Sequence, residues 1–327
     1  MKRSLVFIAA CFLLSPVNRS SAAERIRVAF VSPSAVQSVP WIAKETGIFA
    51  KYGLDAEVIL LTGSPRLVQS LIAGDVDYAL VGVTAVMRAR LRGAEVVVLA
   101  TTTNVSNQKL MVTRRSGIRQ LEDLKGRVIG VSQYGSEADT FARIALGKVG
   151  LKPDRDVAIL QLGGHPQVAA ALAAGKIEAG VLGGLASLTT QQAGALLLTS
   201  AVELKTLSPS GTLTTTRSTI QRNRDSVARF MRSYLEALHY FKTNRTGTIA
   251  ILQKYMGGIS AHQAGFLYDE QVDLLEPLPI PNEKGLQAVL DREDDPKARN
   301  FNPADFVDLS FLKEIGRSGL IENLYRK

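Results

Sequence analysis

Residues Ile59–Gly82 read ILLTGSPRLVQSLIAGDVDYALVG, and Leu160–Gly183 read LQLGGHPQVAAALAAGKIEAGVLG. At an offset of 101 the identical pairs are Leu61/Leu162, Gly63/Gly164, Pro65/Pro166, Leu71/Leu172, Ala73/Ala174, Gly74/Gly175 and Gly82/Gly183. A shorter echo precedes each copy, because Ile26–Ser32 (IRVAFVS) matches Gly126–Ser132 (GRVIGVS) at an offset of 100. A repeat of this length predicts two similar structural units in one chain.

Each copy of the repeat predicts a strand, a tight turn and a helix. Ser64 and His165 each stand directly before a proline, a residue favoured in the first turn of a helix. We therefore predict that both residues are N-caps and that Gly74 and Gly175 end the two helices. Two such units that face each other would form a cleft, and small ligands bind in clefts.

The rest of the chain alternates between strands and helices, which predicts an α/β fold with a parallel-rich sheet and helices on both of its faces. The expected strands are 25–31, 54–61, 76–82, 94–100, 110–113, 127–132, 157–162 and 177–182. The expected helices are 40–52, 64–73, 84–92, 118–124, 136–148, 165–174, 225–243, 246–255, 260–270 and 304–316.

The element order also predicts how the chain divides into domains. One lobe should comprise residues 24–105 plus 207–327, including the C-terminal helices, and the other lobe residues 106–206. Chain crossings near 101–108 and 204–212 would then form a two-strand hinge. Hinges of this kind permit closure around a ligand.

The first 23 residues are interpreted as a secretory signal peptide. Lys2 and Arg3 precede the apolar run Ser4–Leu14, which is too short to span a bilayer, and small residues end at Ala23. An alternative is lipidation at Cys11, because residues 8–11 (IAAC) resemble a bacterial lipobox. Either interpretation places the mature protein outside the cytoplasm, in the periplasm of a bacterium.

Composition excludes several classes of function. Cys11 is the only cysteine, so a mature chain would have no disulfide, thiol nucleophile or cysteine-bound metal. Without Lys2, Arg3 and Arg19 the formal charge falls from +9 to +6, a modest excess. No zinc-finger spacing, aromatic RNA-binding signature or arginine-rich tail indicates a nucleic-acid partner.

Three segments resemble a known family. Ala43–Val58 (AKETGIFAKYGLDAEV), Ser70–Ala79 (SLIAGDVDYA) and Asp123–Val131 (DLKGRVIGV) are similar to segments of the periplasmic substrate-binding proteins that serve nitrate-, sulfonate- and taurine-type importers. The binders of thiamine-pyrimidine precursors share them. The resemblance implies a type II periplasmic-binding-protein fold, with two Rossmann-like lobes joined by a two-strand hinge. It also implies a ligand held between the lobes and delivery to an ATP-driven (ABC) importer.

Two departures from that family bear on the ligand. Sulfonate-type members often carry an aromatic-rich segment after the second repeat, whereas Gly183–Gln192 (GGLASLTTQQ) has no aromatic residue. This first departure argues against a sulfonate or taurine ligand. The yeast-type pyrimidine synthases of the superfamily carry a cysteine-rich motif, which a mature chain without cysteine lacks.

The repeat predicts where a ligand would bind. Ligands of open α/β sheets lie beyond the carboxyl ends of the strands, where helix N-termini offer free N–H groups and glycines allow close approach to the main chain. The candidate ligand-binding residues at these strand ends are Gln37, Ser38, Thr62, Gly63, Ser64, Arg66, Gly82, Thr84, Gln133, Tyr134, Gly135, Ser136, Gly164, His165 and Gly183.

Each candidate side chain also has a structural interpretation. Ser64 and His165 could serve only as caps, and Tyr134 could cover the rim of the cleft instead of stacking on a ligand. Arg66 could be a solvated helix residue instead of the partner of an anion. Ser136 and Asp139 form a capping-box-like helix start.

Two further residues stay outside the candidate list. Glu137 could stabilise its helix N-terminus or bind a ligand amine. Trp41, the only tryptophan, is interpreted chiefly as a core residue.

We therefore expect a monomeric binding protein that uses neither cofactor nor metal. The three histidines lie on separate elements, and no nucleophile elbow, phosphate loop or dinucleotide fingerprint is present. The loops are rich in hydroxyl and amide groups, which favours a singly charged anion or a polar heterocycle as the ligand. The expected partners are an ABC permease and, through it, its ATPase. A protein that feeds a membrane sensor and an exported enzyme are the alternatives.

Overall fold

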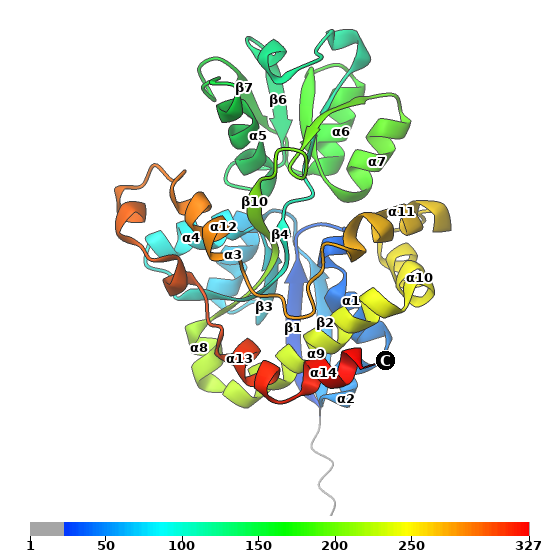
Figure 1. The fold of residues 1–327 in the computed structure, drawn as a ribbon, viewed down its shortest axis with the longest axis vertical. Helices are drawn as coiled ribbons and strands as arrows, with labels where there is room; N and C mark the ends of the chain where they lie inside the picture. Colours follow the sequence, from blue (N-terminus) through cyan, green and yellow to red (C-terminus); the bar gives the residue numbers. More distant parts are fainter. Residues whose placement is uncertain (1–22, 327) are drawn as a thin grey trace, which may run out of the picture.

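The computed structural model describes residues 23–326, which form two lobes (Figure 1). Each lobe is built on a five-stranded sheet with helices packed against it. Residues 1–22 of the predicted leader, Cys11 among them, lie outside the described residues.

The first sheet has the strand order β2-β1-β3-β10-β4. Its strands are β1 (Glu24–Phe30), β2 (Leu54–Leu60), β3 (Tyr78–Val81), β4 (Val96–Val105) and β10 (Leu207–Thr216). β1 pairs parallel with β2 and β3, whereas β10 runs antiparallel to β3 and β4.

The second sheet repeats this arrangement in the order β7-β6-β8-β5-β9. Its strands are β5 (Lys109–Val112), β6 (Val128–Val131), β7 (Ala158–Gln161), β8 (Ala179–Leu182) and β9 (Leu196–Ser200). β6 pairs parallel with β7 and β8, and β5 runs antiparallel to β8 and β9. Both sheets are therefore evenly mixed, and the expected parallel-rich sheet is wrong in this respect, because the crossing segments return antiparallel.

The helices of the first lobe cover its sheet and carry the chain to its C-terminus. They are α1 (Val39–Glu45), α2 (Ile48–Lys51), α3 (Ser64–Ala73), α4 (Val83–Leu91), α8 (Arg217–Arg222), α9 (Arg224–Thr243), α10 (Arg245–Tyr255), α11 (Ala261–Val272), α12 (Glu283–Leu290), α13 (Ser310–Arg317) and α14 (Leu320–Tyr325). Those of the second lobe are α5 (Glu137–Lys148), α6 (His165–Ala173) and α7 (Gly184–Gln192). Short 3₁₀ turns complete the fold, including Leu121–Leu124, where we expected a helix over 118–124.

Several expected boundaries differ from the structure. The helix expected over 40–52 is two short helices, because Gly47 adopts a left-handed conformation (φ 72°) that interrupts it. The sequence did not predict helices α7, α8, α12 and α14 or strand β9. The expected helix at 304–316 begins only at Ser310, after a 3₁₀ turn.

The core of the first lobe contains the only tryptophan. Trp41 is fully buried, lies edge-on to Phe30 at 5.1 Å between ring centroids, and stacks on Tyr255 at 5.0 Å. α1 thereby packs against the C-terminal helices α9 and α10. The interpretation of Trp41 as a core residue is confirmed.

Two long strands lead toward the second lobe (Figure 1). β4 and β10 pair antiparallel, and they carry buried hydroxyls where a sheet interior usually has aliphatic side chains. Thr102 Oγ1 donates to the carbonyl of Gly211 at 2.9 Å, and Thr212 Oγ1 donates to that of Val81 at 2.6 Å. These bonds satisfy hydroxyls that burial would otherwise leave unpaired.

Candidate functional site

The carboxyl ends of the repeated strands meet across the gap between the lobes. Gln133, which follows β6, packs so closely on Gly63 that the glycine has no room for a Cβ atom. A Cβ atom on Gly164 would lie 3.6 Å from Thr62 Cγ2. The two Gly-x-Pro turns of the repeat thus lie where the lobes meet, at the place of the expected cleft.

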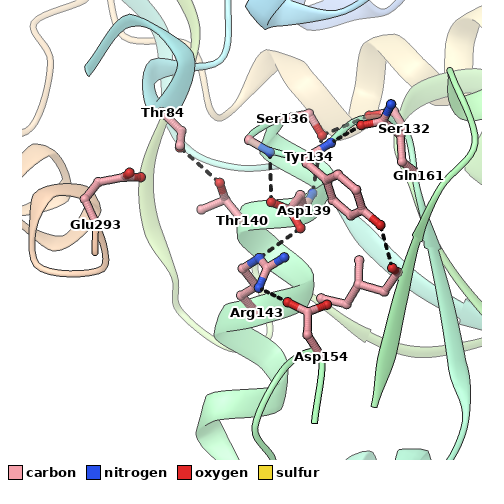
Figure 2. Close-up of polar contacts among 12 residues, drawn as sticks. Thr84, Ser132, Tyr134, Ser136, Asp139, Thr140, Arg143, Asp154, Gln161 and Glu293 are labelled. Atoms are coloured by element: carbon pink, nitrogen blue, oxygen red, sulfur yellow. Dashed lines mark hydrogen bonds and ion pairs between the residues drawn. The ribbon is translucent and has the colours of Figure 1, made fainter. Parts of the chain in front are cut away.

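One flank of this cleft is formed by α4 and α5. Thr84 on α4 is buried, and its hydroxyl lies 3.0 Å from that of Thr140 on α5 (Figure 2). Arg88 on α4 lies against Gly135 and donates through Nε to the Glu293 carboxylate at 2.8 Å. The first lobe thus contacts the second at the start of α5, where the sequence predicts a capped helix at Ser136.

The opposite flank is formed by α7 and α11. Leu185 on α7 packs against the core of the first lobe. Lys109, at the start of β5, donates to the Glu270 carboxylate on α11 at 2.6 Å. Ser34 also approaches α7, with its Cβ 3.2 Å from the position of a Cβ on Gly184.

Ser64 does not cap its helix, and that prediction is wrong. Gly63 occupies the N-cap position with a φ of 95°, and Ser64 is the first helical residue. The buried Ser64 hydroxyl instead accepts a hydrogen bond from the Gly82 N–H at 3.0 Å. It therefore links the start of α3 to the end of β3, at the position where both border the cleft.

His165 is also not a cap, because Gly164 takes the N-cap position of α6. Its imidazole lies against the end of β8, with Cε1 3.2 Å from where a Cβ of Gly183 would stand. Burial lowers the pKa of His165 to about 4, and the backbone of Gly183 opposes this shift only in part. The ring is therefore neutral at physiological pH.

The loop between β6 and α5 is tied down by its own polar groups (Figure 2). Ser136 is the N-cap of α5, and its hydroxyl accepts from the Asp139 N–H at 3.3 Å and from the Ser132 hydroxyl at 2.9 Å. The Asp139 carboxylate accepts from Gly135 N–H and from Arg143 at 2.9 Å each. The cap at Ser136 is confirmed, although Asp139 bonds to Gly135 and not back to Ser136.

Tyr134 is turned along the second lobe (Figure 2). Its hydroxyl donates to the Ile159 carbonyl on β7 at 2.9 Å, and its N–H donates to Gln161 at 2.8 Å. The side chain is 49% exposed. This anchoring favours a role at the rim over stacking deep in the cleft.

Other candidates serve the local structure. Gln37 accepts through Oε1 from the Val31 N–H at 2.8 Å, and Ser38 donates to the Ala35 carbonyl at 2.8 Å. Both side chains are buried and hold the loop after β1. Arg66 is exposed on α3, as expected of a solvated helix residue.

The polar cluster around Glu137 lies at the start of α5. A Cβ atom on Gly82 would lie 3.6 Å from the Cβ of Glu137, so this residue reaches the end of β3 in the opposite lobe. Burial raises the pKa of the Glu137 carboxyl, and three polar neighbours oppose the shift only in part. With those neighbours it forms what we call the Glu137 cluster: Glu137, Ser106, Gln108 and Ser210.

Ser106, Gln108 and Ser210 were not among the candidate residues. The sequence could have indicated them, because they are polar residues in segments that cross between the lobes and are buried there. Glu137 was interpreted from its place at a helix start, and nothing local to it indicates its neighbours.

Two surface hollows lie elsewhere. One of about 450 Å³ is lined by residues of β1 and β2 with Lys44, and one of about 310 Å³ by β1, α8 and the start of α9. Their charged residues are of both signs and include the ion pair of Arg27 with Asp77. None of the candidate ligand-binding residues lines either hollow.

The described residues form neither a metal site nor a membrane-spanning helix. Within residues 23–326 no three or more His, Cys, Asp and Glu side chains are grouped as a metal site would require. None of the helices in that range is long and apolar enough to cross a membrane.

The fold is shared with known proteins. The model of the family described as NMT1/THI5 like matches residues 38–246. The chain belongs to the NMT1/THI5-like family. The family resemblance seen in the sequence is thereby confirmed.

The relatives of this NMT1/THI5-like protein carry the names of binding proteins. A Brucella abortus protein provisionally named binding protein BAB2_1146 is 33% identical over 164 residues, which are 50% of this chain and 49% of that protein. The chain therefore spans about half the length of the curated Brucella relatives that it matches. A Bacillus subtilis protein provisionally named an aliphatic sulfonates-binding protein is 27% identical over 253 residues, 74% of this chain and 75% of that one.

Solved structures confirm the two-lobed periplasmic-binding-protein fold. The periplasmic nitrate-binding protein NrtA of Synechocystis PCC 6803 superposes with a TM-score of 0.75 at 14% identity, over 90% of this chain and 89% of that one. The periplasmic aliphatic sulphonate binding protein SsuA of Escherichia coli gives 0.67 at 20% identity, over 93% and 99%. A DszB mutant in complex with biphenyl-2-sulfinic acid gives 0.67 at 16% identity, over 90% and 99%.

Proposed function

We propose that this NMT1/THI5-like protein is an extracytoplasmic solute-binding protein. It captures a small organic solute between two lobes that close on a hinge. The observation that carries the proposal is the convergence of Gly63, Gly82 and His165 with the Glu137 cluster at facing strand ends. That edge is where ligands of open α/β sheets bind.

The proposed lobes are residues 24–105 plus 207–327 and residues 106–206. Sheet membership supports this division, because β4 ends at Val105, β5 begins at Lys109 in the other sheet, and β10 returns to the first sheet at Leu207. The short segments 106–108 and 201–206 would flex as the lobes open and close.

We propose as binding residues those candidates that border the cleft. Ser64, Gly82, Thr84, Gln133, Gly164, His165 and Gly183 form its walls. Thr62, Gly63, Gly135 and Ser136 shape the turns around it, and Tyr134 would cover the rim. Gln37, Ser38 and Arg66 contribute structure more than contact.

The proposed partner is an ABC importer, contacted through its permease and driven by its ATPase. A ligand binding component of an ABC-type import system from Staphylococcus aureus has this fold and supports that assignment. The names of the periplasmic nitrate- and sulphonate-binding proteins with this fold support a periplasmic location, to which the predicted leader would direct the chain. A protein of this kind would act as a monomer. The alternative, a binding protein that feeds a membrane sensor, uses the same cleft.

Solute binding is favoured over catalysis. DszB shares the fold, so the fold alone does not separate the two functions. His165 is neutral at physiological pH, and its hydrogen-bond partner is the backbone of Gly183. Catalysis by a base would need a nucleophile or substrate proton within hydrogen-bond reach.

Three experiments test the proposal. A thermal-shift screen of organic solutes should raise the melting temperature, because a ligand at 100 times its Kd stabilises a protein by about 2.7 kcal/mol. A bound compound recovered unchanged indicates a binding protein, whereas conversion to product indicates an enzyme. Uptake of that compound in a deletion strain should fall for an importer and stay unchanged for a sensor.

A further inference from the structure

The Glu137 cluster holds oxygen atoms that the described chain leaves without partners. Glu137 Oε1, Gln108 Oε1 and Ser210 Oγ are covered from solvent, and none has a hydrogen bond of normal geometry from residues 23–326. Gln108 is 4% exposed and Ser210 is 1% exposed. Buried polar groups in native proteins are nearly always paired, so three orphans side by side indicate a missing partner.

The chemistry of these atoms indicates what that partner must supply. Carboxylate and amide oxygens only accept hydrogen bonds, while a serine hydroxyl can donate or accept. Ser106, Gln108 and Ser210 lie within hydrogen-bond reach of the Glu137 carboxyl and oppose the rise in its pKa, but none of them gives Oε1 a hydrogen bond of normal geometry. When Glu137 is ionised, a ligand that contacts it must therefore bring hydrogen-bond donors.

The charges around Glu137 also favour a ligand that donates hydrogen bonds. No lysine or arginine is among the groups that influence Glu137. Basic side chains on the flanks of the cleft are engaged elsewhere, Arg88 with Glu293 at 2.8 Å and Lys109 with Glu270 at 2.6 Å. A bound anion would face a carboxylate without a counter-ion, whereas a cation would neutralise it.

We propose that Glu137 determines specificity by binding a protonated or N–H-bearing nitrogen group of the solute, with Gln108 and Ser210 as further contacts. This inference rests on the proposed function and narrows its ligand from an anion or a polar heterocycle to a compound with an amine, amidine or amino-heterocycle group. A charge-assisted hydrogen bond to a buried carboxylate supplies both affinity and orientation.

Matched pairs of probes test the inference by calorimetry and thermal shift. One pair is benzamidinium and benzoate, the other butylammonium and butyrate, with nitrate and methanesulfonate as small anions. The variants are Glu137→Gln, which keeps the shape but removes the charge, and Glu122→Gln as a matched control, because Glu122 is an exposed residue of the same lobe.

The nitrogen-bearing member of a pair should bind the wild-type protein and its carboxylate counterpart should not. Glu137→Gln should weaken that binding about 10- to 100-fold, and Glu122→Gln should leave it unchanged. Anions that bind, with equal affinity in the wild type and in Glu137→Gln, would overturn the inference and leave solute binding standing. If none of the nitrogen-bearing probes binds, the inference fails, whereas the proposed function fails only if the wider screen of organic solutes also finds no ligand.

Discussion

The hydroxyls of Thr84 and Thr140 lie 3.0 Å apart, and they join α4 of one lobe to α5 of the other (Figure 2). The contact exists only while the lobes are together, so its free energy belongs to closure and not to folding of either lobe. We expect Thr84→Val and Thr140→Val each to weaken solute binding, with a coupling of about 0.5–1.5 kcal/mol in a double-mutant cycle. Calorimetry with the probe that binds the wild type measures it. Full additivity of the two variants would show that the hydroxyls do not interact in the bound state.

The stability of the ligand-free protein should rise when Glu137 loses its charge. Because burial raises its folded pKa, the carboxyl favours the folded state fully below its unfolded pKa of about 4.3 and loses that contribution as pH rises through the folded value. Glu137→Gln should therefore be more stable than the wild type by on the order of 1–2 kcal/mol near pH 8, and the difference should shrink toward pH 4.5. Urea unfolding across that range measures it. A constant difference between the two proteins at every pH would contradict the assignment.

His165 should make the protein sensitive to acid. Its folded pKa of about 4 lies below the unfolded value of about 6.5, so its contribution to stability is present above pH 6.5 and is lost as pH falls toward 4. We expect this pKa shift to contribute about 1–3 kcal/mol to stability, because solvent reaches the half-buried ring and weakens the effect of burial. His165→Gln should lose less stability than the wild type between pH 7 and pH 4, whereas His262→Gln, at an exposed position, should follow the wild type. Parallel unfolding curves for all three proteins would remove His165 from this role.

Trp41 should matter for folding and not for binding. Trp41→Ala removes the stack on Tyr255 and the contact with Phe30, at a cost of about 3–5 kcal/mol in unfolding free energy. Trp41→Phe keeps most of that packing and removes an indole N–H that has no partner among the described residues, so it should cost about 1 kcal/mol. Urea unfolding distinguishes the two. If probe affinity falls in Trp41→Phe while the protein stays folded, Trp41 belongs to the binding site.

The repeat predicted the architecture because its signals are local. A glycine, a helix-starting proline and a closing glycine recur in both copies, and α3 and α6 start at equivalent residues, Ser64 and His165. The same local rules failed for the caps. Gly63 takes the N-cap position of α3, while the Ser64 hydroxyl bonds to Gly82, which is 18 residues away.

Contacts between residues far apart in the chain explain why the sequence did not predict α7 or the neighbours of Glu137. The segment that forms α7, GLASLTTQQ, has no clear apolar period, and it packs through Leu185 on the core of the other lobe. Glu137 was interpreted as a charge at a helix start, since its neighbours Gln108 and Ser210 lie far away in the chain and meet it only in the folded protein. Local patterns carry no information about such meetings.

Native mass spectrometry of the protein freshly purified from cells tests the central claim most directly. The account predicts that the wild type and Glu122→Gln release one small nitrogen-bearing molecule on gentle activation, and that Glu137→Gln carries little or none of it. Equal occupancy in all three proteins, or a released molecule with no N–H group, would contradict the account.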